Sequence, residues 1–304
     1  MVVPMKRAGK RGSLMAAENR VWKLMIAPSL LLLILMSIYP MVFNVYNSFF
    51  DWNFASSQPR RFVGLENFQG VLTDQNFLRA MLNTLLLVAS AVTLEFLLGF
   101  LIALLFHQSV AGTRLFRSLM IAPTMITPIV ASLMWLLMYN SDYGVVRYLL
   151  QCIGIQSPPA LLASKTLAMP AVILVDVWQW TPFVMLILLA GLTSMPRDVI
   201  EAAQVDGANS RQRFFSIVLP SLRPVVAVAL LMRVMDTFKF FEVVYMLTKG
   251  GPGNVTETVS YFAYKEGFSF FEVGRSSASC LVILFVVLTV CQLLNHLIAD
   301  EWEV

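Results

Sequence analysis

The sequence is poor in charge: only 13% of its 304 residues are Asp, Glu, Lys or Arg, whereas 58% are hydrophobic. A soluble globular protein has about 25% charged residues, so the composition excludes an ordinary soluble domain and places the chain in a lipid bilayer. The formal net charge of +4 is small, and the charges are scattered along the chain. This distribution argues against a surface for nucleic acid.

Cysteine and histidine are also scarce. Cys152, Cys280 and Cys291 form no CxxC pattern, and the last two lie in an apolar run where a thiol behaves as a small hydrophobe. His107 and His296 are single residues near the ends of apolar runs, where we expect them at the membrane interface. The sequence therefore predicts neither a disulfide framework nor a metal site.

Several motifs that carry chemistry are missing. No GxxxxGK[ST] occurs, so the chain cannot hold the phosphates of ATP by that motif. There is no HExxH or GxGD, and no aspartate cluster that could bind a metal. These absences argue against a membrane-embedded hydrolase or prenyl-type transferase. We expect no cofactor in this chain, so any ATP that is used must bind to another subunit.

Long apolar runs are what the sequence has in abundance. A helix needs about 20 apolar residues to cross the hydrocarbon core of a bilayer. The first run is too long for the core of a cleaved signal peptide, about 7–15 residues, and Pro182 predicts a kink or local unwinding in the fourth. The sequence predicts an all-α membrane protein with six transmembrane helices, over about 24–46, 81–106, 118–139, 168–192, 225–247 and 278–297.

The distribution of Lys and Arg predicts the orientation of these helices. With both termini in the cytoplasm, the cytoplasmic segments carry more Lys and Arg than the external ones. We find no convincing internal repeat and no stretch that suggests a second soluble domain. The predicted organisation is a basic cytoplasmic segment 1–23, a first helix 24–46, an external loop 47–80, a transmembrane core 81–297 and a cytoplasmic tail 298–304.

The polar loop between the fourth and fifth predicted helices is longer than a simple connection requires. It lies within 196–224, and from Glu201 to Pro224 it reads EAAQVDGANSRQRFFSIVLPSLRP. Pro196 suits the first turn of a helix, and acidic residues early in that helix complement its dipole. Asp206-Gly207 predicts a break, because glycine tolerates the positive φ of a tight reversal. A second helix is expected over 208–218, ending before Pro220.

Two interpretations of this loop are open from its residues. An ordinary amphipathic loop could anchor its arginines to anionic lipid. Alternatively, the loop docks on a partner protein: Ala202, Ala203 and Ala208 would let that partner approach the backbone closely, and Glu201 would offer a carboxylate to an arginine.

The spacing of Glu-Ala-Ala, Asp-Gly and Leu-Pro resembles the cytoplasmic coupling loop of bacterial ABC importer permeases. The resemblance implies that this loop docks on an ATPase subunit. It assigns the ATPase-coupling role to the residues of the three motifs, Glu201, Ala202, Ala203, Asp206, Gly207, Leu219 and Pro220.

Three further stretches resemble the carbohydrate branch of binding-protein-dependent ABC permeases: Tyr39-Pro40, 178–183 (WQWTPF) and 238–252 (FKFFEVVYMLTKGGP), the last followed by Thr256. They are similar to maltose- and glycerol-phosphate-type sugar permeases, and to the first subunit of the usual permease pair. The chain departs from the maltose-type subunit in having no large periplasmic insertion, so contacts made through such an insertion do not carry over.

This resemblance implies a type I ABC importer transmembrane domain with a cytoplasmic coupling helix, located in the bacterial inner membrane. The implied partners are a homologous second permease subunit, a cytoplasmic ATP-binding subunit dimer, an extracytoplasmic solute-binding protein and membrane lipid.

Charged residues inside a membrane are costly and therefore indicate function. At 1.5 Å per residue, Asp176 and Asp236 both come near the middle of the bilayer. Carboxylates and amides can bind sugar hydroxyls, and aromatic faces can cover the apolar side of a sugar ring. Asp236, Phe240 and Val243 share one face of a continuous helix. The candidate residues for the substrate pathway are Asp176, Trp178, Gln179, Trp180, Thr181, Asp236, Phe240 and Tyr245.

Some alternatives stay open at this point. Arg233 could pair with Asp236 three residues on, or with Glu95, which is expected at a similar depth. An ion-coupled secondary transporter would also contain intramembrane charges, but it predicts an inverted repeat and does not explain a docking loop. An importer permease for a non-sugar solute is a further alternative, and the identity of the sugar is not specified by the sequence.

Overall fold

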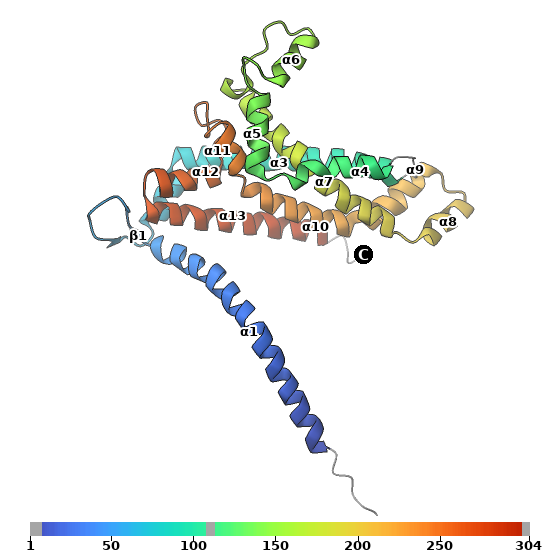
Figure 1. Cartoon of the computed structure of the whole chain (residues 1–304), viewed down its shortest axis with the longest axis horizontal. Helices are drawn as coiled ribbons and strands as arrows, with labels where there is room; N and C mark the ends of the chain where they lie inside the picture. Colours follow the sequence, from blue (N-terminus) through green and yellow to red (C-terminus); the bar gives the residue numbers. More distant parts are fainter. Residues whose placement is uncertain (1–7, 108–112, 300–304) are drawn as a thin grey trace, which may run out of the picture.

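Four long helices lie side by side and form the body of the molecule (Figure 1). The computed structural model describes residues 8–107 and 113–299, and the predicted segments at the two ends extend beyond this range, into 1–7 and 300–304. The four helices are α3 (Gln75–His107), α7 (Ala168–Ser194), α10 (Leu219–Phe238) and α13 (Val273–Ala299).

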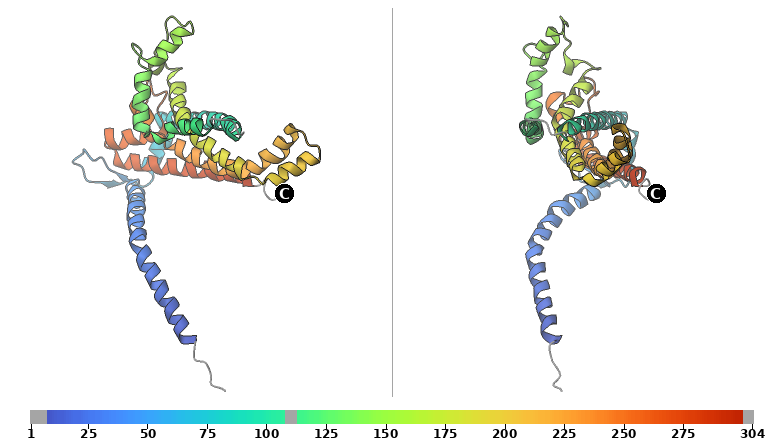
Figure 2. Two further views of the ribbon diagram at one scale, coloured as in Figure 1. Left: turned by 45° about the vertical axis from the view of Figure 1, so that its right-hand side comes forward. Right: turned by 90° about the vertical axis from the view of Figure 1, so that its right-hand side faces the viewer.

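The first helix, α1 (Ala8–Asn47), extends away from this body in every view (Figures 1 and 2). From Met25 to Tyr46 its apolar side chains are exposed; Leu31, for example, is 61% exposed. Near its C-terminal end it contacts α13, where the Ser277 hydroxyl donates to Asn44 Oδ1 at 3.2 Å. A short hairpin and a helix follow in the predicted external loop: β1 (Phe50–Asp51), β2 (Arg61–Phe62) and α2 (Glu66–Thr73).

Five helices in the described residues are long and apolar enough to cross a membrane: Met25–Asn47, Gln75–His107, Ala168–Ser194, Ser210–Leu247 and Val273–Leu297. The sixth predicted segment is instead a pair of shorter helical pieces, Leu115–Met125 and Pro128–Met138, bent by 98°. The pair comprises α4 (Thr113–Ile121), η1 (Ala122–Met125) and α5 (Pro128–Met138). Two prolines, Pro123 and Pro128, each begin a new piece, because a proline lacks the N–H that would continue the preceding helix.

After this bend the chain leaves the body. Helices α5 and α6 (Val145–Cys152) project on the side opposite to α1 (Figures 1 and 2). A short turn, η2 (Leu161–Ala163), leads back to α7. Helix α7 then continues through Pro182, so the local unwinding expected at that proline is absent.

The fifth predicted helix is not continuous. Helix α10 ends at Phe238, and α11 (Glu242–Leu247) begins after a three-residue break. The prediction of one continuous helical face through Phe240 and Val243 was therefore wrong. Helix α12 (Val259–Tyr264) and the π-helical turn η4 (Lys265–Ser269) complete the connection to α13.

The stretch that ends in Gly-Gly-Pro forms a loop after α11 that is tied to α3. Asn83 Nδ2 on α3 donates to the carbonyl oxygens of Asn254 at 2.9 Å and Glu257 at 3.0 Å. Inside the loop, the Thr256 hydroxyl donates to the Gly251 carbonyl at 2.8 Å. This stretch therefore fixes the end of α3 against the segment between α11 and α12.

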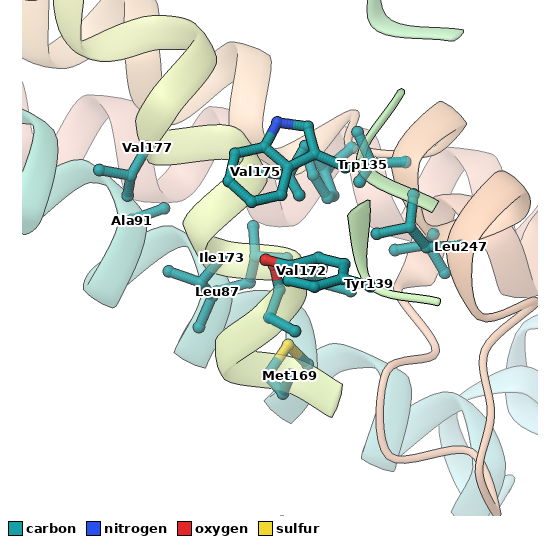
Figure 3. Packing of buried hydrophobic residues seen from close by; sticks show 14 of the residues in the cluster. Leu87, Ala91, Trp135, Tyr139, Met169, Val172, Ile173, Val175, Val177 and Leu247 are labelled. Atoms are coloured by element: carbon teal, nitrogen blue, oxygen red, sulfur yellow. The ribbon is translucent and has the colours of Figure 1, made fainter. Parts of the chain in front are cut away.

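Close packing of α3 against α7 forms the largest part of the core. A side chain at Gly99 would place its Cβ 3.1 Å from the Met185 backbone nitrogen, so glycine permits the close approach of these helices. Leu87 and Ala91 of α3 lie beside Val175 and Val177 of α7, with Trp135 and Tyr139 covering α7 from α5 (Figure 3). The Tyr139 hydroxyl donates to the Ala171 carbonyl at 3.0 Å. This packing holds the middle of α7 in a fixed position.

Candidate functional site

Three buried charged side chains meet in the middle of the bundle, one from each of α3, α7 and α10. Arg233 donates through Nε to Glu95 Oε2 at 2.6 Å and through Nη2 to Glu95 Oε1 at 2.7 Å. Its Nη2 also donates to Asp176 Oδ2 at 3.0 Å. All three side chains are at most 1% exposed. Of the two partners considered for Arg233, Glu95 is therefore correct and Asp236 is wrong.

The cluster leaves one hydrogen-bond acceptor unused. Asp176 Oδ1 is buried and has no hydrogen-bond partner among the described residues. A buried acceptor without a partner is costly, so its position beside a cavity is informative. The guanidinium of Arg233 also lies 5.0 Å from the centre of the Trp180 ring, a distance suited to a cation–π contact.

A cavity of about 240 Å³ adjoins this cluster. Its walls come from α7, α10, the break after α10 and the first residues of α5 and α11. They combine carboxylates, an amide and aromatic rings in the side chains of Pro128, Asp176, Gln179, Trp180, Arg233, Asp236, Lys239, Phe240, Glu242 and Val243. Donors, acceptors and ring faces thus converge on one space, as in many small-molecule sites.

Most of the predicted pathway residues line this cavity. Asp236, Phe240 and Val243 all line it although the helix between them is broken. Their contact with a solute stays a prediction. The other lining residues from the predicted set are Asp176, Gln179 and Trp180.

Three predicted pathway residues lie elsewhere. Trp178 packs edge-to-face on Trp135, with 5.6 Å between ring centres, as expected if it and Gln179 face different directions. Thr181 is buried and its hydroxyl has no partner among the described residues. Tyr245 stacks on Phe241 with ring centres 5.4 Å apart.

Sequence reasoning missed two contributors to the cavity. Pro128 and Glu242 both stand at the first residue of a helix that begins after a break. Proline at position 128 was a usable signal for the first break, but 239–241 contains no Pro or Gly that could have indicated the second. Gln179 is tied to the first break, because its Nε2 donates to the Ile126 carbonyl at the bend, at 2.9 Å.

The second candidate region is the polar loop between α7 and α10. Helix α8 (Arg197–Val205) ends at Asp206, and Gly207 adopts φ +81°, which confirms the predicted break at Asp-Gly. Asn209 then caps α9 (Ser210–Arg213). Its side chain accepts from the Gln212 N–H at 2.9 Å, and Gln212 Oε1 accepts from the Asn209 N–H at 2.8 Å. This reciprocal cap fixes the start of the second helix.

The second helix continues further than predicted. After α9 the chain passes through the π-helical turn η3 (Phe214–Val218) directly into α10. The expected stop before Pro220 was wrong, because Pro220 occupies the first turn of α10, where a proline is tolerated. One continuous helical segment therefore links α9 to Arg233.

The loop presents an exposed surface at one end of the bundle (Figures 1 and 2). Val205 is 88% exposed, and Glu201, Ala202, Asp206 and Gly207 are exposed as well. Ala203 and Ala208 are half-buried. The C-terminal end of α13 lies at this same end (Figure 1).

Comparison with known proteins identifies the family of this chain. Residues 95–300 match the family model described as binding-protein-dependent transport system inner membrane component. A probable ABC transporter permease protein of Sinorhizobium fredii is 43% identical over 269 residues, which are 88% of this chain and 86% of that protein. The trehalose/maltose transport system permease protein of Thermococcus litoralis is 35% identical over 273 residues, 90% of this chain and 91% of that protein.

A solved structure shows the same fold. It is that of a bacterial ABC transporter involved in the import of the acidic polysaccharide alginate, with a TM-score of 0.80. The two chains are 23% identical, and the superposition covers 95% of this chain and 99% of the other. At that identity the likeness establishes the fold and nothing more specific.

Proposed function

The chain belongs to the family of binding-protein-dependent transport system inner membrane components, and from that premise we propose that it forms half of the translocation pathway of an ATP-driven sugar importer. Its relatives are sugar ABC permeases, and it is a transport subunit and not an enzyme. The observation that carries the proposal is the cavity beside Asp176, which lies between two helices that lead directly to the exposed loop.

The chemistry of the cavity supports a sugar or sugar-like solute. Asp176 and Asp236 offer acceptors for hydroxyl groups, Gln179 offers an amide, and Trp180 and Phe240 offer aromatic faces for the apolar side of a ring. The trehalose/maltose permease similarity points the same way.

The arrangement of helices supports coupling through the loop. Helix α7 enters the loop from Asp176, and α10 leaves it toward Arg233 and Asp236. We propose that an ATPase dimer binds α8 and α9 around Glu201 and Gly207. Closure of that dimer would then move both walls of the cavity and switch its accessibility between the two sides of the membrane.

The remaining assignments follow from this proposal. The protein is an inner-membrane subunit with both termini and 196–224 in the cytoplasm, and with 47–80 outside. A homologous second permease subunit completes the pathway, and an external solute-binding protein delivers the solute, as the family description implies. ATP binds to the ATPase subunits.

Uptake by reconstituted vesicles tests the proposal. Proteoliposomes containing this chain, its partner permease, the ATPase and the binding protein should accumulate a radiolabelled sugar such as trehalose or maltose only with ATP on the ATPase side. An imposed proton or sodium gradient without ATP should give no accumulation. Uptake driven by the gradient alone would favour an ion-coupled transporter. ATP-dependent uptake of amino acids or peptides, and not of sugars, would overturn the sugar assignment.

A further inference from the structure

Each cation beside the cavity lies near a carboxylate of the protein itself. Arg233 is held by both oxygens of Glu95 and by one oxygen of Asp176, and it is 1% exposed. Three of the five guanidinium N–H groups, on Nε and Nη2, thus point at carboxylates, and two carboxylates offset the single positive charge. The most buried positive charge of the site therefore serves the protein and not a ligand.

The second cation is also accompanied by a carboxylate. Lys239 Nζ lies 3.7 Å from Asp236 Oδ1, and both side chains are largely exposed. Glu242, which also lines the cavity, has no ion-pair partner among the described residues. Three acidic residues of the cavity wall, Asp176, Asp236 and Glu242, thus outnumber the two basic ones, Arg233 and Lys239, so an anion entering the cavity meets more negative than positive charge.

The unused hydrogen-bonding group of the cluster is also an acceptor, which favours a solute that donates. Asp176 Oδ1 is a buried acceptor that lacks a donor within the described residues, and a hydroxyl group that reached it would supply the missing hydrogen bond. A deprotonated phosphate or carboxylate oxygen supplies no donor, and it would approach the carboxylates of Asp176 and Asp236 in a partly desolvated space, where like charges repel strongly.

We infer that the cavity accepts polyhydroxy solutes without an anionic group, such as neutral sugars and polyols, and excludes their phosphorylated, sulfonated and carboxylated counterparts. This inference rests on the proposed function, because it assumes that the solute passes through this cavity. Hydroxyl groups would donate to Asp176 and Asp236, and Trp180 would cover the apolar side of the solute. Selectivity then comes from the permease as well as from the binding protein.

Matched pairs of probes test the inference in proteoliposomes containing the complete importer. The pairs are trehalose with trehalose 6-phosphate and glycerol with sn-glycerol 3-phosphate, and maltose is added as a further neutral sugar. We expect ATP-dependent uptake of at least one neutral probe, about tenfold or more faster than that of a phosphorylated one. Equal or faster uptake of a phosphorylated probe would overturn the inference and leave the ATP-driven importer intact. No ATP-dependent uptake of any probe would count against the proposed sugar function itself.

A permease variant separates the contribution of the cavity from that of the binding protein. Asp236→Asn removes one carboxylate from the cavity wall, so it should narrow the ratio of neutral to phosphorylated uptake at least about threefold, even if it slows both. Asp142→Asn, at an exposed acid outside the cavity, is the matched control and should keep the wild-type ratio. An unchanged ratio in Asp236→Asn would show that the cavity does not select on charge.

Discussion

In the middle of the bundle, Arg233 is 1% exposed and binds two carboxylates from two other helices, whereas at the end of the bundle Val205 is 88% exposed. The first region is completed by the chain's own side chains. The second is held in shape locally, by the Asn209 cap and the reversal at Gly207, and leaves its outer surface uncovered. The difference teaches that the buried cluster is satisfied by this chain's own fold, whereas the loop keeps an exposed surface, on which we propose that the ATPase acts.

The two regions should therefore fail in different ways. A change in the buried cluster should affect the stability of the protein, because the removal of one charge leaves others buried and unpaired. A change in the loop should leave stability intact and affect the response to the ATPase. The predictions below separate these outcomes, beginning with the largest expected effect.

Substitution of Arg233 should have the largest effect. Arg233→Met removes the cation and leaves Glu95 and Asp176 buried without it, so we expect a loss of about 3–5 kcal/mol in stability. Arg211→Met, at an exposed position on α9, should change stability by no more than about 0.5 kcal/mol. Thermal and denaturant unfolding of the purified protein in nanodiscs measures both. Similar stability for the two variants would mean that the buried cluster does not hold the three helices together.

Substitution of Gly207 by proline should have the next largest effect, on ATP-dependent uptake. Gly207 has φ +81°, which proline cannot adopt. Gly207→Pro should therefore reduce ATP-dependent uptake by up to about 100-fold, near the upper range of coupling free energies between sites, without lowering the unfolding temperature of the spans. Gly154→Pro is a matched control, because Gly154 has φ +97° in a loop far from α8. If both variants transport alike, the loop has no special coupling role.

Substitutions in the cavity should have a smaller effect. Asp236→Asn and Trp180→Ala should each reduce uptake about tenfold, because each removes one polar or aromatic contact with the solute. The ATPase should still co-purify with both variants. Trp178→Phe keeps the packing on Trp135 and should retain uptake within about twofold. Wild-type uptake in both cavity variants would remove this cavity from the pathway.

The sequence predicted those features of the fold and the site that depend on a local pattern or on a single residue type. Runs of apolar residues indicated the long helices, Asp-Gly indicated the reversal at Gly207, and the cost of a buried charge indicated that Arg233 needs a partner such as Glu95. In each of these cases a single residue type or a continuous pattern carries the physical constraint.

The rest depends on tertiary contacts that no local pattern encodes. The break after Phe238 lies in a stretch without Pro or Gly, so the sequence there favours a continuous helix. The bend between η1 and α5 is held by Gln179 from a distant helix. Conversely, Pro220 does not end a helix, because the chain reaches it through a π turn that continues into α10. Such features require the packed structure.

The most direct test of the account is the amount of solute moved per ATP hydrolysed in the reconstituted importer. For the wild-type protein and for the control Asp142→Asn, this ratio should be the same. For Glu201→Lys, which reverses the charge offered by α8, we expect the ratio to fall sharply, or the ATPase to dissociate, while the spans stay folded. A wild-type ratio and rate in Glu201→Lys would contradict the claim that this exposed loop transmits the action of the ATPase to the cavity.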